Sequence, residues 1–183
     1  MKTKAIIFDL DGTLLDSMHI WQAQPYEWDN IAEAYKHEVV LKPGVFKFLT
    51  QLQQHGIRMV LATATDRHLM EPALHRNKMY NFFETILTCR EVGESKETPL
   101  IYHKALDFLK VSKEEVWVFE DAFYAIRTSA NAGFKTAAIH DKWVREFSHR
   151  MYGKIIEHED IMKYADVYID DYTKITAKEF LQT

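Results

Sequence analysis

The sequence predicts an α/β fold, a Rossmann-like three-layer sandwich with a mainly parallel central sheet. Three observations support this prediction. Short apolar runs alternate along the chain with stretches of helical spacing, as in proteins built from strand-helix-strand units. The composition, 47% hydrophobic and 27% charged, is typical of a packed globular protein. The length of 183 residues suits one domain. We therefore expect residues 1–183 to form a single core domain.

The expected strands are short apolar runs bounded by turn residues or polar side chains. Strict alternation of apolar and polar residues is missing from them, which favours strands of a parallel sheet with both faces covered. The runs lie at residues 5–8, 57–62, 85–87, 116–119, 136–139 and 167–169.

Apolar side chains spaced three and four residues apart predict helices between these strands. Residues 45–52 share one apolar side before Gly56 ends the helix. A second helix is expected after Asp66, in the N-cap position. A third is expected to begin at Thr98 and Pro99, which have the form of an N-cap and a first-turn proline.

Two segments interrupt this alternation. Residues 17–42 are rich in aromatic side chains, and Pro25 is expected to divide a short first piece from a helix of about three to four turns. The aromatic cluster, which includes Tyr26, could pack on its own domain or form an exposed patch for a homo-oligomer. Residues 141–165 are expected to form a helical excursion between the last two strands.

Charge and composition exclude several classes of partner. The formal charge is −4, and the basic residues form no long run, so no nucleic-acid partner is expected. The first apolar run stops at Asp9, which predicts neither a signal peptide nor a membrane span. Cys89 is the single cysteine, and an isolated thiol favours a cytoplasmic location.

The strongest local signal follows the first strand. Asp9 and Asp11 are two residues apart, so on an extended chain their side chains point to the same side. Two close carboxylates repel each other unless a cation offsets their charge, and Mg²⁺ prefers oxygen ligands. Gly12 allows a sharp turn, and Thr13 could offer a hydroxyl and an amide to an anion. Alternatively, these residues form an acidic turn without further function.

Polar residues also end the later strands. Thr63 follows the second apolar run, Lys96 precedes a helix, and Glu120 and Asp121 end a strand. Taken singly, these residues could be a turn residue, a solvated lysine and a helix cap. Because the carboxyl ends of parallel strands meet at one edge of the sheet, their common position favours a shared site.

The ordered set of motifs resembles the haloacid dehalogenase superfamily. Residues 9–13 have its pattern Asp-x-Asp-Gly-Thr, and with residues 14–17 they are similar to the branch of β-phosphoglucomutase-like phosphatases. Residues 60–63 look like the second motif, Lys96 like the third, and residues 118–122 like the fourth.

This resemblance implies a Mg²⁺-dependent phosphatase that hydrolyses a phosphate monoester, with a small phosphorylated metabolite as the expected substrate. Asp9 would be the nucleophile and form an aspartyl-phosphate. Asp11 would donate a proton to the leaving group and then activate water. Thr63 and Lys96 complete the expected catalytic set.

The resemblance also implies the ligands. Phosphate would be bound by Thr13, Thr63, the amide of Ala64 and Lys96. Metal ligands would come from Asp9, the backbone carbonyl of Asp11, Asp121, and Glu120 directly or through water.

One departure concerns the helical cap that the resembling branch inserts before Pro43 and Gly44. Here only residues 17–42 stand in its place, a truncated helical cap segment with room for one or two helices. An open entrance is expected, which favours hydrolysis because water would enter easily. Two alternatives stay open: a phosphomutase on a small sugar phosphate, and a low-activity binding protein that retains the fold.

Overall fold

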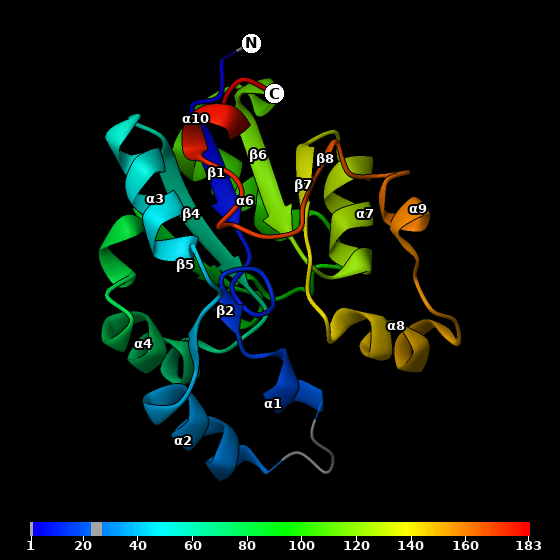
Figure 1. Ribbon diagram of the computed structural model, residues 1–183. Coiled ribbons are helices and arrows are strands. Elements are labelled where there is room, and N and C mark those ends of the chain that lie inside the picture. Colours follow the sequence, from blue (N-terminus) through cyan, green and yellow to red (C-terminus); the bar gives the residue numbers. More distant parts are fainter. Residues whose placement is uncertain (1, 23–26) are drawn as a thin grey trace.

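The computed structural model describes residues 2–22 and 27–183, and a six-stranded parallel sheet forms its centre (Figure 1). The strand order is β5-β4-β1-β6-β7-β8. All predicted strands are confirmed, with ends within one residue of expectation. Their bounds are β1 (Ala5–Phe8), β4 (Arg58–Thr63), β5 (Thr85–Thr88), β6 (Val116–Glu120), β7 (Lys135–Ile139) and β8 (Val167–Ile169).

Helices cover both faces of this sheet, which confirms the predicted three-layer sandwich. Ile6 and Phe8 of β1 face one core, and Ala5 and Ile7 face the other, because successive side chains of a strand point to opposite sides. The first core is covered by α3 (Val45–Gln54), α4 (Arg67–Arg76) and α10 (Ala177–Phe180). The second face is covered by α6 (Leu100–Leu109) and α7 (Phe123–Asn131). The shorter elements are η1 (Tyr80–Phe82), α5 (Cys89–Val92) and η2 (Lys113–Glu115).

Two helix starts differ in detail from expectation. Asp66 occupies the N-cap position of α4, but its carboxylate pairs with Arg90 at 2.7 Å and makes no capping hydrogen bond. The helix expected to start at Thr98 and Pro99 begins one residue later, with Pro99 itself at the N-cap. The Thr98 hydroxyl donates to Glu94, and no side chain caps the start of α6.

The segment between β1 and α3 contains two helices. A short two-stranded antiparallel ribbon joins the two ends of this segment. Its elements are β2 (Leu15–Asp16), α1 (Met18–Gln22), α2 (Trp28–His37) and β3 (Val40–Leu41). β2 and β3 pair antiparallel. α2 has 10 residues, about three turns. Pro25, on which the predicted division rests, and Tyr26 of the aromatic cluster lie outside the described residues.

The aromatic side chains of this segment divide between core and surface. Tyr35 is fully buried, Ile31 is nearly so, and Trp21 packs against the same core. Trp28 is 60% exposed. Packing on the chain's own domain therefore holds for most of the described cluster, and a homo-oligomer through residues 17–42 stays a prediction.

The predicted helical excursion at residues 141–165 is confirmed as α8 (Val144–Tyr152) and α9 (His158–Ile161). The strands point toward the lower edge of Figure 1, where α1, α2 and α8 lie, and both termini lie at the opposite end. Among the described residues, no helix has both the length and the apolar character needed to cross a bilayer.

Candidate active site

The site lies where the order of the sheet reverses. From β1 the chain proceeds to β4 and β5 on one side, and then crosses to β6 on the other. Ligands in open α/β sheets bind beyond the strand ends at such a point. Asp9 directly follows β1, and its amide donates to the carbonyl of Phe119 at 2.9 Å. Glu120 ends β6 and Asp121 follows it. One carboxylate oxygen from each of the three acidic residues lies within 4.8 Å of the others.

Gly12 allows Asp121 to approach the loop after β1. The glycine has a φ of +81°, in the left-handed region that side chains disfavour. A Cβ at this position would lie 2.2 Å from Asp121 Oδ2. The buried Thr13 hydroxyl donates to the other oxygen, Asp121 Oδ1, at 3.1 Å. Thr13 thus supports an acidic side chain and does not line the cavity, and its predicted contact with phosphate stays a prediction.

Lys96 is the cation of this cluster. It lies between α5 and α6, almost fully buried, and its Nζ donates to Asp9 Oδ1 and, at 2.7 Å, to Glu120 Oε1. Burial disfavours the ammonium, but the Asp9 and Glu120 carboxylates together outweigh burial and raise the pKa of Lys96. Tyr102 also donates to Glu120 Oε1, at 2.7 Å. Lys96 is therefore held protonated between two carboxylates.

The carboxylates outnumber the cation, and one buried carboxylate oxygen has no hydrogen-bond partner among the described residues. Asp121 Oδ2 is buried without a hydrogen bond. Burial, followed by Asp9 and Glu120, raises the pKa of Asp121 well above its ordinary value. Burial also raises the pKa of Glu120, to about 8, although Lys96 opposes the shift. An orphaned oxygen among buried carboxylates fits a hard divalent cation such as Mg²⁺, which takes oxygen ligands and offsets their repulsion.

Asp11 has surroundings of a different kind. Its Oδ1 accepts from Ser17 at 2.6 Å and from Tyr35, and its Oδ2 accepts from Thr65 at 2.7 Å. It is not one of the three clustered carboxylates. Burial raises the pKa of Asp11, and the hydroxyl groups that donate to it oppose that shift. Asp11 is thus suited to holding a proton.

A cavity of about 220 Å³ joins the two arrangements. Its polar side brings together all predicted site residues except Thr13, namely Asp9, Asp11, Thr63, Ala64, Lys96, Glu120 and Asp121. The buried Thr63 accepts a hydrogen bond from the amide of Thr65 at 3.0 Å. The rest of the lining is mainly apolar and aromatic, with Met18, Trp21, Phe123, Tyr124, Val144 and Tyr152, and it includes Ser148.

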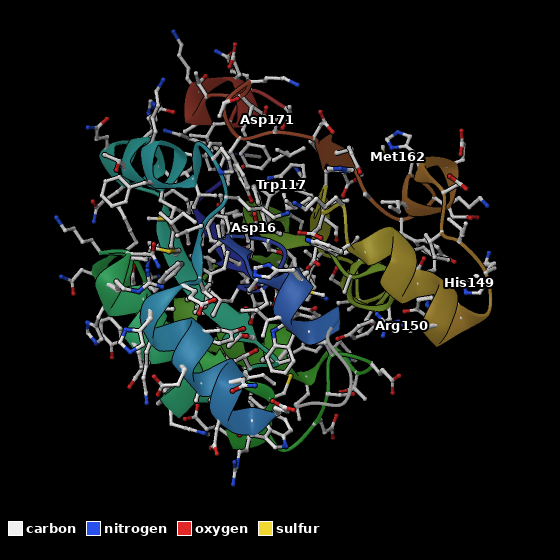
Figure 2. All side chains as sticks on the ribbon, turned by 60° about the horizontal axis from the view of Figure 1, so that its bottom comes forward. Asp16, Trp117, His149, Arg150, Met162 and Asp171 are labelled. Carbon is white, nitrogen blue, oxygen red and sulfur yellow. The ribbon has the colours of Figure 1, made fainter. Side chains whose placement is uncertain are left out.

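α1 and α8 supply part of this lining, and the open entrance expected from the short cap segment stays a prediction. Figure 2 shows the two helices next to each other, with Arg150 and His149 marking α8. Sequence reasoning predicted helices at both places, but it had no signal for where either helix would lie on the core.

Several functional candidates escaped the sequence analysis. Thr65 could have been found, since it lies two residues after Thr63, and alternate residues of extended chain share a side. Tyr35 and Trp21 lie in the cap segment, where no motif is matched. Tyr102 lies in the helix expected after Pro99, and nothing in the sequence marks it as a partner of Glu120.

Comparisons with known proteins agree with this geometry. The profile of the haloacid dehalogenase-like hydrolase family matches residues 25–139, well over half of the chain. Pyrophosphatase PpaX of Bacillus thuringiensis is 24% identical, over 76% of this chain and 84% of its own length.

Two solved structures share the fold. CbbY from Rhodobacter sphaeroides, determined with phosphate, has a TM-score of 0.71 at 20% identity and covers 95% of this chain and 96% of its own. L-2-haloacid dehalogenase from Xanthobacter autotrophicus has a TM-score of 0.65 at 12% identity, with 93% and 95% covered. The motif order, the clustered site and the matched profile lead to one conclusion: the chain belongs to the haloacid dehalogenase-like hydrolase family.

Proposed function

We propose that this hydrolase is a Mg²⁺-dependent phosphatase that cleaves a phosphate monoester through an aspartyl-phosphate on Asp9. The observation that carries the proposal is the unpartnered Asp121 Oδ2, buried beside Asp9 and Glu120. A protein that used this fold only for binding would have no physical need for such an excess of buried negative charge.

Asp9, Asp121 and the backbone carbonyl of Asp11 would hold the cation, with Glu120 as a direct or water-bridged ligand. Bound there, Mg²⁺ supplies positive charge to phosphoryl oxygens. Lys96 supports the same function next to Asp9, because its ammonium reduces the repulsion between an anionic phosphate and an anionic nucleophile.

The chain's own groups account for both steps. An Asp9 oxygen forms a bond to phosphorus, and the bond from phosphorus to the leaving oxygen breaks while Asp11 gives that oxygen a proton. Asp11, now a carboxylate, then takes a proton from water as the water oxygen attacks phosphorus. Phosphate leaves and Asp9 is regenerated. Thr63 and the amide of Ala64 would hold a phosphoryl oxygen throughout.

The cavity supports a compact substrate. Apart from Lys96, the described residues that line it provide no cation for a second phosphate. The apolar wall would contact the leaving group by dispersion and exclusion of water. Because curated relatives are named pyrophosphatases, pyrophosphate must be compared with phosphate monoesters.

The test is a panel of phosphorylated metabolites and pyrophosphate, incubated with Mg²⁺ or with a chelator. Phosphate release that requires Mg²⁺ is expected, together with an acid-stable phosphoryl adduct in the intact mass that is absent from Asp9→Asn. Isomerised phosphate without release would identify a mutase instead. No turnover across the panel would contradict the proposal and favour a binding protein.

A further inference from the structure

The cap segment reaches Asp11 through Ser17, its first residue, and through Tyr35 of its second helix. Tyr35 of α2 is fully buried and donates to Asp11 Oδ1. Within residues 2–22 and 27–183, Asp11 forms no ion pair, so its carboxyl group is oriented by hydroxyl donors alone. Ser17 and Thr65 are the other two donors; Ser17 directly follows β2 of the ribbon, and Thr65 follows β4 of the central sheet. Tyr35 is the only one of the three that comes from a helix of the cap segment.

Trp21 determines the direction of the Tyr35 hydrogen bond. Its Nε1 donates to the Tyr35 hydroxyl at 2.9 Å, and the two rings meet edge to face at 6.2 Å. Indole can only donate, so it occupies a lone pair of the phenol oxygen and leaves the phenol proton for Asp11. Burial, and then the charge of Asp11, raises the pKa of Tyr35 well above its ordinary value. Tyr35 therefore keeps the proton that it donates.

The helix that carries Tyr35 is fixed to the core. α2 packs along α4, and Ile31 and Tyr35 share a hydrophobic cluster with α4 residues. Just after α2, the Val39 carbonyl accepts from Arg76 and, at 3.0 Å, from Asn77, which anchors the end of the segment. Tyr35 is thus presented to Asp11 from a rigid element, as precise positioning of a reacting group requires.

We propose that Tyr35, oriented by Trp21, is a positioning residue for Asp11. On this view the reduced cap segment keeps one task of a cap, which is to orient the acid-base group, while α8 supplies part of the wall that a larger cap would provide. The inference rests on the proposed phosphatase function, since it assigns Tyr35 a role only through proton transfer by Asp11.

Tyr35→Phe tests this role, because it removes the hydroxyl and keeps the ring. The readout is kcat/KM with Mg²⁺ for two substrates, an alkyl phosphate and a nitrophenyl phosphate. An alkoxide needs a proton in order to leave, whereas nitrophenolate needs little help. General acid catalysis contributes roughly 10²–10⁴-fold. If Asp11 is misoriented, we expect kcat/KM to fall about tenfold or more for the alkyl phosphate and less than about threefold for the nitrophenyl phosphate.

A double-mutant cycle separates positioning from general damage. In an Asp11→Asn background, Tyr35→Phe should cause no further loss on either substrate, because a residue that acts through Asp11 has nothing left to orient. Trp21→Phe keeps an aromatic ring but removes the indole donor. It should also lower kcat/KM more for the alkyl phosphate than for the nitrophenyl phosphate, but by a smaller factor than Tyr35→Phe. It also serves as the test variant if Tyr35→Phe folds poorly.

Tyr168→Phe is the matched control. The Tyr168 hydroxyl bonds His140 Nδ1 at 2.8 Å and lies outside the cavity, so both substrates should be unaffected. Equal losses of Tyr35→Phe on the two substrates, or a loss that persists in Asp11→Asn, would overturn the inference. If the unsubstituted protein releases phosphate from neither substrate nor from any member of the panel above, the proposed function fails and this inference fails with it.

Discussion

Asp9 and Asp11 are two residues apart and line one cavity, yet the protein compensates them by different means. Asp9 lies against the Lys96 ammonium and two further carboxylates. Asp11 lies against three uncharged hydroxyl groups. A neighbouring ammonium offsets negative charge, which suits a nucleophile and metal ligand that must approach an anionic phosphate. Neutral donors orient a carboxyl group without forcing it to stay ionised, so it can gain and lose a proton.

The largest expected effect comes from removing the negative charge of Asp9. Asp9→Asn removes the nucleophile and one metal ligand, so kcat should fall on the order of 10⁴-fold or more in a phosphate-release assay. Asp16→Asn is the matched control, since Asp16 is nearby in β2 but does not line the cavity. Turnover of Asp9→Asn within tenfold of the unsubstituted protein would remove the covalent step.

Gly12→Ala should have the next largest effect, because the acidic cluster depends on the close approach of Asp121 to this glycine. The new Cβ would meet Asp121 Oδ2 at 2.2 Å, at a φ of +81°. We expect a loss of about 2–4 kcal/mol in the free energy of unfolding, from strain and overpacking together, and weaker Mg²⁺ binding.

The control for this glycine is Gly153→Ala. Gly153 has a φ of +67°, but no atom lies within 4 Å of a Cβ placed there. Gly153→Ala should lower the free energy of unfolding by only about 1–2 kcal/mol, the cost of backbone strain alone. Equal losses for the two variants in urea unfolding would show that the contact with Asp121 is unimportant.

Asp121→Asn should have opposite effects on the stability of the metal-free protein and on Mg²⁺ binding. Without a cation, this substitution relieves repulsion among buried carboxylates, so the chelator-treated protein should become more stable by about 1 kcal/mol. Added Mg²⁺ should no longer raise the melting temperature. A variant that is less stable than the unsubstituted protein in chelator would indicate that Asp121 is already compensated without metal.

The smallest expected effect is a change in Mg²⁺ stabilisation with pH. The folded-state pKa of Glu120 is about 8, above its ordinary value of 4.5. The folded metal-free protein therefore binds a proton that the unfolded chain releases. Stability from this group is fully present below about pH 4.5 and is lost as pH rises through 8.

Mg²⁺ competes with that proton, so its stabilising effect should grow with pH. The increase in melting temperature on adding Mg²⁺ should be larger by a few degrees near pH 8 than near pH 6. Differential scanning fluorimetry in matched ionic strength measures this difference. The same increase at both values would mean that the acidic cluster does not exchange protons for the cation.

The sequence predicted the charged residues around Asp9 far better than the hydroxyl donors around Asp11. Asp9, Glu120 and Asp121 lie at or directly after strand ends, and parallel strand order brings such ends together without any knowledge of side-chain packing. Lys96 lies between α5 and α6 and was predicted from its place in the order of motifs. Tyr35 could not be predicted in the same way. It belongs to a helix whose position depends on packing against α4, and an aromatic residue at helical spacing indicates a core position only.

Local chemistry explains the smaller errors. Asp66 stands at the expected N-cap, but Arg90, which comes from a distant part of the chain, takes its carboxylate. The Thr98 hydroxyl donates to Glu94, in the residues before α6, and lies outside the N-cap position that Pro99 occupies. Capping patterns consider only neighbours along the helix, and at Asp66 a competing partner determined the outcome.

The ribbon formed by β2 and β3 has a consequence for how this chain could change. Leu15 pairs with Leu41 and Asp16 with Val40, so the stretch between them leaves and re-enters the core at adjacent points. An insert attached there can be lengthened at a cost that grows only slowly with its length. The catalytic core can therefore accept lids of very different size while the strand that carries its nucleophile stays undisturbed.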